Sequence, residues 1–217
     1  MATTHTQLQQ LHQALEQCRL CVDMQGPAVH GEACVSPVML IGQAPGFKEI
    51  EVHKPFAWTA GKTLFNWFER IDVNEQLFRQ RVYMSAVCRC FPGKHHNGKR
   101  LKSGDRTPSA DEIANCSQWL TREIELVQPA LIIPVGKLAI QQFMPVNKLS
   151  DVIGQSHSIT LNHQHCELIP LPHPSGASTW PRTEPGKSLL NQALQLISDH
   201  PQWQQLFSAS TAGNASR

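Results

Sequence analysis

The 217-residue sequence lacks a long hydrophobic run and carries little net charge. No apolar stretch approaches the roughly 20 residues that a membrane-spanning helix needs. The first residues also lack the basic segment followed by an apolar stretch that marks a secretory signal. We therefore expect a cytoplasmic protein that makes no contact with a membrane.

The formal charge of +2 excludes a polycation that coats nucleic acid indiscriminately. The charge is nevertheless uneven, because the segment 79–106 has Asp105 as its only acid. Its basic residues are Arg79, Arg81, Arg89, Lys94, Lys99, Arg100, Lys102 and Arg106. This local excess predicts contacts with phosphate groups, and a solvated basic loop is the alternative.

Internal repeats and coiled-coil heptads are absent as well. A chain of this length is long enough to bury the core of one α/β domain. We expect a single domain over residues 1–207 and a monomer. The last residues, 208–217, are small and polar, which predicts a disordered tail.

Apolar runs and helical periodicity alternate along the chain. Short apolar runs predict buried strands at 38–41, 82–87, 131–135 and 168–171. Helical patterns occupy 1–17, 63–71, 110–127, 137–143 and 186–198. Ser109 and Glu112 form a capping-box pattern at the start of the long third pattern.

This alternation predicts a three-layer α/β/α sandwich with a central four-stranded, mostly parallel sheet. Functional sites in such folds gather at the carboxyl ends of the strands. In this sequence the corresponding segments are 42–56, 88–106, residue 136 and 172–180.

Seven cysteines are an odd number, and a cytosolic chain keeps its thiols reduced. A metal or cluster is therefore a better interpretation than a disulfide framework. Cys18 and Cys21 form a CxxC pair, which lets two thiolates meet at one metal centre. Cys90 and Cys116 complete a set of four sulfurs, which fits a 4Fe-4S iron–sulfur cluster or a four-cysteine zinc site.

The remaining cysteines have a simpler interpretation. Cys34 and Cys166 fit small hydrophobic side chains packed in the core. Cys88 lies two residues before Cys90, and in an extended segment the two side chains share a face. Either of them is therefore a candidate for the third ligand.

Several short motifs follow one another in a fixed order. Gly42-Gln43-Ala44-Pro45-Gly46 is followed by Lys54-Pro55-Phe56, Ala60-Gly61 and Leu64, and His173-Pro174-Ser175 comes near the end. Together with the cysteines, they resemble the uracil-DNA glycosylase superfamily and best match its iron–sulfur branch, family 4. The resemblance spans roughly residues 11–198, and the order of the motifs carries it because each motif alone is unspecific.

The resemblance implies a 4Fe-4S cluster held by Cys18, Cys21, Cys90 and Cys116, whose positions match the ligands of that branch. The third ligand of the branch precedes a proline-containing turn, as Cys90 does, which favours Cys90 over Cys88. The implied role is structural, because the cluster would join three segments that lie far apart in the sequence.

The resemblance further implies a DNA-repair glycosylase that flips a damaged base, most simply uracil, and hydrolyses its N-glycosidic bond. Phe56 matches the ring that stacks on the flipped base. His173 matches the histidine that donates a hydrogen bond to the departing base. The other expected base-binding residues are Gly42, Ala44, Gly46 and Ser85.

Two positions depart from the pattern of the branch. Gln43 stands where the branch has a carboxylate, and an amide cannot act as a general base. Glu49 is then the nearest candidate to orient the attacking water, and a solvated loop carboxylate is the alternative. Ala86 stands where the branch has an asparagine that reads the uracil edge. We still expect hydrolysis, because a dissociative reaction needs little help from a base.

The expected partners are DNA containing a damaged base and the downstream enzymes that process abasic sites. The expected phosphate contacts are Ser175, Lys94, Lys99 and Arg106. Three alternatives stay open: a glycosylase for another deaminated base such as hypoxanthine, a non-catalytic damaged-DNA-binding protein on the same fold, and a zinc-stabilised nucleic-acid-binding module.

Overall fold

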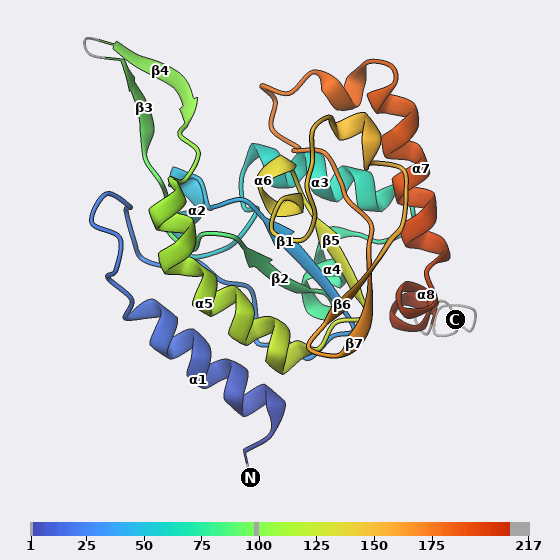
Figure 1. Ribbon diagram of the computed structural model, residues 1–217, viewed down its shortest axis with the longest axis horizontal. Helices are drawn as coiled ribbons and strands as arrows, with labels where there is room; N and C mark the ends of the chain where they lie inside the picture. The colour runs from blue at the N-terminus through green and yellow to red at the C-terminus, as the bar shows by residue number, and fades with distance from the viewer. Residues whose placement is uncertain (1, 98–99, 209–217) are drawn as a thin grey trace, which may run out of the picture.

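A computed structural model describes residues 2–97 and 100–208 (Figure 1). Within this part of the chain, the central sheet has five strands in the order β2-β1-β5-β7-β6. The parallel strands are β2 (Tyr83–Ala86), β1 (Val38–Gly42), β5 (Leu131–Pro134) and β7 (Gln164–Leu168). The expected tail lies outside the described residues, apart from Ser208.

The fifth strand, β6 (His157–Leu161), corrects the four-stranded expectation. It pairs antiparallel with β7 through the two-residue turn Asn162-His163, in which both residues have positive φ, 48° and 66°. Such a turn matches the twist of a hairpin, but its usual sequence signal is Asn-Gly. The predicted strand at 168–171 therefore begins earlier, and Leu171 retains only an isolated bridge to Val135.

The helices cover both faces of the sheet and confirm the α/β/α layers. They are α1 (Thr4–Glu16), α2 (Phe47–Val52), α3 (Thr59–Glu69), α4 (Glu75–Arg81), α5 (Ala110–Val127), α6 (Lys137–Ile140), α7 (Gly186–Asp199) and α8 (Pro201–Phe207). Short 3-10 turns lie at η1 (Leu149–Asp151) and η2 (Trp180–Arg182). Of these helices, α2, α4 and α8 had no counterpart in the sequence patterns.

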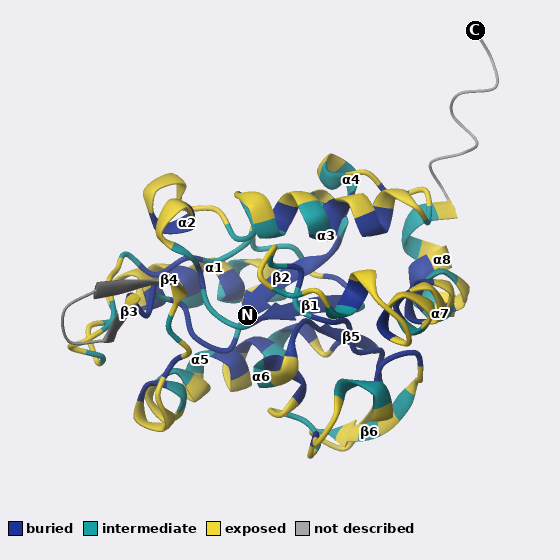
Figure 2. Ribbon diagram, turned by 90° about the horizontal axis from the view of Figure 1, so that it is seen from above, coloured by how far each residue is buried: buried dark blue, intermediate teal, exposed yellow. Residues whose placement is uncertain are grey.

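Successive side chains of β1 point to opposite faces of the sheet and contribute to two separate core layers. Val38 and Leu40 pack with α3, α4, α7 and α8, whereas Met39 and Ile41 pack with α1 and α5. Figure 2 shows the buried sheet between helices whose outer sides are exposed. No helix of the described segments is long and apolar enough to cross a membrane.

Three features around α5 position the site. The predicted capping box is confirmed: the Glu112 amide donates to Ser109 Oγ at 3.3 Å, and the Ser109 amide donates to the Glu112 carboxylate at 2.7 Å. Before it, β3 (Lys94–Asn97) and β4 (Arg100–Asp105) form a separate hairpin that stands away from the body (Figure 1). Because α5 lies beside α1, the two helices bring Cys116 near the CxxC segment.

Candidate active site and cysteine cavity

The carboxyl ends of four parallel strands bring the predicted motifs to one edge of the sheet. Gly42 is the register partner of Ala86, and the Val87 amide donates to the Gly42 carbonyl at 2.9 Å. After β5, the Gly136 amide donates to the carbonyl of Leu171 at 2.9 Å. Leu171 lies two residues before His173. The segments after β1, β2, β5 and β7 therefore meet, as expected for a parallel sheet.

A narrow pocket of about 30 Å³ lies at this edge and contains most of the predicted base-binding residues. Its lining consists of Val29, His30, Gly42, Ala44, Pro45, Glu49, Pro55, Phe56, Met84, Ser85 and Ala86. We call it the Phe56 pocket. Among the predicted catalytic and base-binding residues, Gln43, Gly46 and His173 lie outside the lining that the described residues form.

Backbone contacts fix Phe56 in the pocket. Its φ is 53°, and Arg79 donates to the carbonyls of Pro55 at 2.8 Å and Phe56 at 3.0 Å. Gly61 lies so close that an added Cβ would come within 1.7 Å of the Phe56 carbonyl oxygen. The Ala60-Gly61 motif therefore has a steric reason, since only glycine admits this approach. The Phe56 ring packs directly against Gly42.

Glu49 joins the two loops that form the pocket. Its Oε2 accepts from the Gly46 amide at 2.7 Å, and its Oε1 accepts from the Ala57 amide at 3.1 Å. Burial raises the pKa of Glu49, although these amides favour its charged form. Both carboxylate oxygens thus hold backbone groups, which gives Glu49 a positioning role. Gln43 lies in the same turn, where its carbonyl accepts from the Cys88 amide at 3.0 Å.

His173 presents one ring nitrogen for chemistry. The Ser175 amide donates to its Nδ1 at 3.2 Å, so the proton of the neutral ring lies on Nε2. Burial lowers the pKa of His173, which keeps the ring neutral near pH 7. Gly136 has a φ of 88°, and an added Cβ there would lie 3.0 Å from His173 Cδ2. A neutral donor is therefore held against the strand end.

A buried ionic network lies behind the pocket, and sequence patterns did not reveal it. Ser85 Oγ donates to Glu123 at 2.8 Å, and Arg89 donates to Ser85 at 2.6 Å and to Glu123. Arg89 is 1% exposed. Burial opposes its charge, but the adjoining Glu123 carboxylate raises the pKa of Arg89. The Ser85 hydroxyl is therefore engaged with Glu123 and Arg89, although the residue lines the pocket.

Two of the predicted phosphate contacts, Arg106 and Lys94, form ion pairs within the protein. Arg106 donates to both oxygens of Glu112, at 2.7 and 2.5 Å, and its side-chain hydrogen bond lowers the pKa of Glu112. Lys94 lies 2.5 Å from Asp105 at the exposed base of the hairpin. The Arg106 pair joins the end of the hairpin to the start of α5, and the Lys94 pair links β3 to β4. Lys99 lies outside the described residues.

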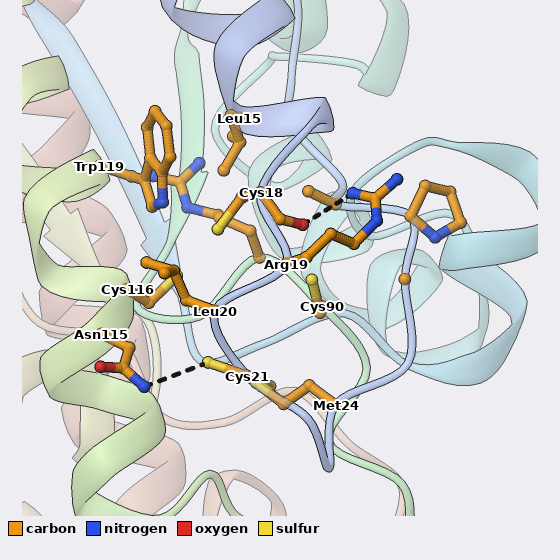
Figure 3. Close-up of a pocket in the computed structure, with 14 residues that line it drawn as sticks. Leu15, Cys18, Arg19, Leu20, Cys21, Met24, Cys90, Asn115, Cys116 and Trp119 are labelled. Carbon is orange, nitrogen blue, oxygen red and sulfur yellow. Dashed lines mark hydrogen bonds between the residues drawn. The ribbon is translucent and has the colours of Figure 1, made fainter.

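A second cavity, of about 400 Å³, contains all four predicted cluster ligands (Figure 3). Cys18 and Cys21 follow α1, Cys90 follows β2, and Cys116 lies on α5. We call it the four-cysteine cavity. As the described side chains lie, no three His, Cys, Asp or Glu residues form a group that could hold a single metal ion.

Cys88 has a different environment from Cys90. It is fully buried and absent from the lining that the described residues give the cavity. A hydrogen bond to Cys116 and burial raise the pKa of Cys88, and the same hydrogen bond lowers the pKa of Cys116 to about 7. Cys90 therefore lines the cavity, whereas the described residues leave Cys88 outside its lining.

Comparisons with known proteins agree with this geometry. The model of the Uracil DNA glycosylase superfamily matches residues 29–196. A type-4 uracil-DNA glycosylase of Pyrobaculum aerophilum is 29% identical over 77% of this chain and 83% of its own length. Its counterpart in Sulfurisphaera tokodaii is 26% identical over 78% and 75%, and that of Saccharolobus solfataricus is 31% identical over 69% and 66%. The chain therefore belongs to the uracil DNA glycosylase superfamily.

Proposed function

We propose that this protein is a DNA glycosylase that hydrolyses the N-glycosidic bond of uracil in DNA and leaves an abasic site. Membership of the superfamily supports this, as do relatives named type-4 uracil-DNA glycosylases that align with most of the chain. The observation that carries the proposal is the half-buried, neutral His173 at the sheet edge that also forms the Phe56 pocket.

In the proposed mechanism, the uracil nucleotide leaves the DNA stack and its base stacks on the Phe56 ring. As the bond between base and sugar breaks, its electron pair moves onto the base, and Nε2–H of His173 donates to the base oxygen. The Ser175 amide fixes the required tautomer through Nδ1. Water then adds to the sugar cation, and its proton leaves with the base.

This route explains how catalysis tolerates Gln43. The sugar cation is already reactive, so the water needs orientation more than deprotonation. Gln43 can orient water through its amide, and Glu49 serves indirectly by holding the Gly46 turn against the Phe56 loop. Glu49 is therefore a positioning residue in this proposal.

We also propose that Cys18, Cys21, Cys90 and Cys116 hold a 4Fe-4S cluster. The residues fit such a group, because four cysteines and several buried N–H donors line one cavity of about 400 Å³. When bound, the cluster supplies a rigid cross-link between α1, the end of β2 and α5. The third ligand is Cys90, since Cys90 lines the cavity formed by the described residues and the fully buried Cys88 does not.

For the DNA contacts, we assign Ser175 and Lys99 to phosphate groups. Lys94 and Arg106 also belong to this surface, but their carboxylate partners reduce the attraction that each offers. The protein acts as a cytoplasmic monomer, and abasic-site processing enzymes take over its product.

A second candidate is excision of another deaminated base, such as hypoxanthine. Ala86 favours it, because this residue lines the pocket with a methyl group that neither donates nor accepts hydrogen bonds. A site without a specific polar reader rejects a different base less strongly.

Oligonucleotides carrying one uracil or one hypoxanthine test both candidates, with alkali added to cut abasic sites. We expect the iron-replete protein to cut at uracil. His173→Ala should lower the rate about 10²–10³-fold, since it removes one donor to the developing anion. His165→Ala, on the exposed β6–β7 hairpin, is the matched control and should retain the rate. Cutting at hypoxanthine alone selects the second candidate, and binding without cutting either oligonucleotide contradicts both.

A further inference from the structure

The four-cysteine cavity has buried donors that lack an acceptor. Nε and Nη1 of Arg89 and Nε1 of Trp119 have no hydrogen-bond partner among the described residues. Both residues line the cavity. Buried N–H groups without partners are rare in native proteins because their desolvation is not compensated. Three unpaired donor atoms on two residues beside one cavity therefore point to an acceptor inside it.

Hydrogen bonds from Nη2 hold the guanidinium of Arg89 in place. Nη2 donates to Ser85 Oγ and to Glu123, which leaves Nε and Nη1 as the free donors of the guanidinium within the described structure. Because the fork is planar and rigid, these contacts also set the direction of the two remaining groups. The orientation of Arg89 is thus determined before anything enters the cavity.

The face of α5 that bears Cys116 carries further donors. Asn115, Cys116 and Trp119 project from this helix towards the cavity (Figure 3). Nδ2 of Asn115 already lies 3.8 Å from Cys21 Sγ as an N–H donor to sulfur. Trp119 is one helical turn beyond Cys116, a spacing that places both side chains on the same side. A ligand rich in sulfur acceptors would accept hydrogen bonds from these N–H groups.

We propose that Arg89 and Trp119 donate N–H hydrogen bonds to sulfur atoms of the bound cluster and thereby position it and set its reduction potential. This inference rests on the cluster assigned above. Four thiolates make the cluster site negative, so the guanidinium also attracts it electrostatically. Hydrogen bonds to cluster sulfurs favour the more negative, reduced form and raise the potential.

Through Ser85 the same guanidinium also reaches the base pocket. Ser85 lines the Phe56 pocket while its hydroxyl contacts Arg89 and Glu123. Arg89 therefore contacts β2 with one edge and the cluster with the other. The cluster would fix the pocket wall through this one side chain.

Trp119→Phe is the cleanest test, because it removes the indole N–H and keeps an aromatic ring. Trp58→Phe, at a half-exposed tryptophan outside the cavity, is the matched control. Anaerobically prepared proteins are compared by iron content, by redox titration monitored by electron paramagnetic resonance, and by the shift of iron–sulfur Raman bands in D₂O. We expect Trp119→Phe to retain four irons per chain, as a 4Fe-4S cluster requires, with a lower potential and a smaller deuterium shift.

Arg89 requires a paired substitution, since removing it alone leaves Glu123 as an uncompensated buried charge. The double variant Arg89→Met/Glu123→Met removes both charges and should lower the potential further. A potential and deuterium shift equal to wild type in both Trp119→Phe and the double variant would overturn the inference, as would a wild-type protein without iron. Uracil cutting by the same wild-type preparation separates this failure from failure of the proposed function.

Discussion

The Phe56 pocket and the four-cysteine cavity both adjoin the end of β2, yet different contacts hold them together. At the pocket, Glu49 and Arg79 bind backbone amides and carbonyls of the two loops. At the cavity, buried ionic groups and unpaired donors surround an open volume. Contacts within the polypeptide hold the pocket, whereas three N–H groups at the cavity have no acceptor among the described residues.

The largest effect should come from the cavity side. Arg89→Met should lower the free energy of unfolding by about 3–5 kcal/mol, because it leaves Glu123 buried without its partner. The double variant Arg89→Met/Glu123→Met should recover most of this loss. Denaturant unfolding of the iron-replete proteins measures both, and equal stability of the single and double variants would contradict the ionic explanation.

On the pocket side, Gly61→Ala should cost about 1–3 kcal/mol of unfolding free energy, because the added methyl group collides with the Phe56 carbonyl. Uracil cutting should fall with it, since the substitution displaces the Phe56 ring that we propose stacks on the base. Gly176→Ala is the control for stability, as an added Cβ there meets nothing within 4 Å. An unchanged Gly61→Ala protein would show that the loop is not held as described.

A smaller effect should appear in the pH dependence of Glu49. Burial raises its pKa, so folding favours the neutral form. The stability that this group contributes is present below the ordinary glutamate pKa of about 4.3 and is lost as the pH rises through the raised value. The advantage of wild type over Glu49→Gln should therefore shrink as the pH rises above about 4.3. Denaturant unfolding at several pH values tests this, with Glu51→Gln on the exposed side of α2 as the control; an advantage that grows with pH would contradict it.

The smallest effect should come from the hairpin. Lys94→Gln should change the free energy of unfolding by no more than about 0.5 kcal/mol, because Lys94 and Asp105 form a largely exposed pair. Thermal unfolding at low and high salt measures it. A loss well above 1 kcal/mol would mean that the pair is as important as the buried one.

Local sequence patterns predicted the parts of this molecule that depend on local chemistry. The apolar runs located β1, β2 and β5, and the Ser109 and Glu112 pattern located the start of α5. The β6–β7 hairpin was missed because His163 adopts a positive φ where glycine is the usual signal. Helix α4 was missed although Asn74 caps it.

At the site, contacts between residues far apart in the sequence could not be predicted. The motifs selected Phe56 and Glu49 as candidates, and the structure places both in the lining of one pocket. Arg89 lies between two cysteines, which marks it as unusual, but no local pattern pairs it with Glu123, 34 residues away. The hydrogen bonds of the Ser85 hydroxyl involve the same two residues. Such buried networks follow from packing across the sheet and need the fold to be seen.

The most direct measurement is amide hydrogen exchange of the iron-replete protein before and after a chelator removes the proposed cluster. If the cavity depends on its cluster and the pocket does not, amides of residues 18–27 and of the first turns of α5 will lose protection, while the Ala57 amide and its neighbours in 42–61 keep theirs. Equal loss in both regions, or no loss in either, would contradict the distinction between the two cavities.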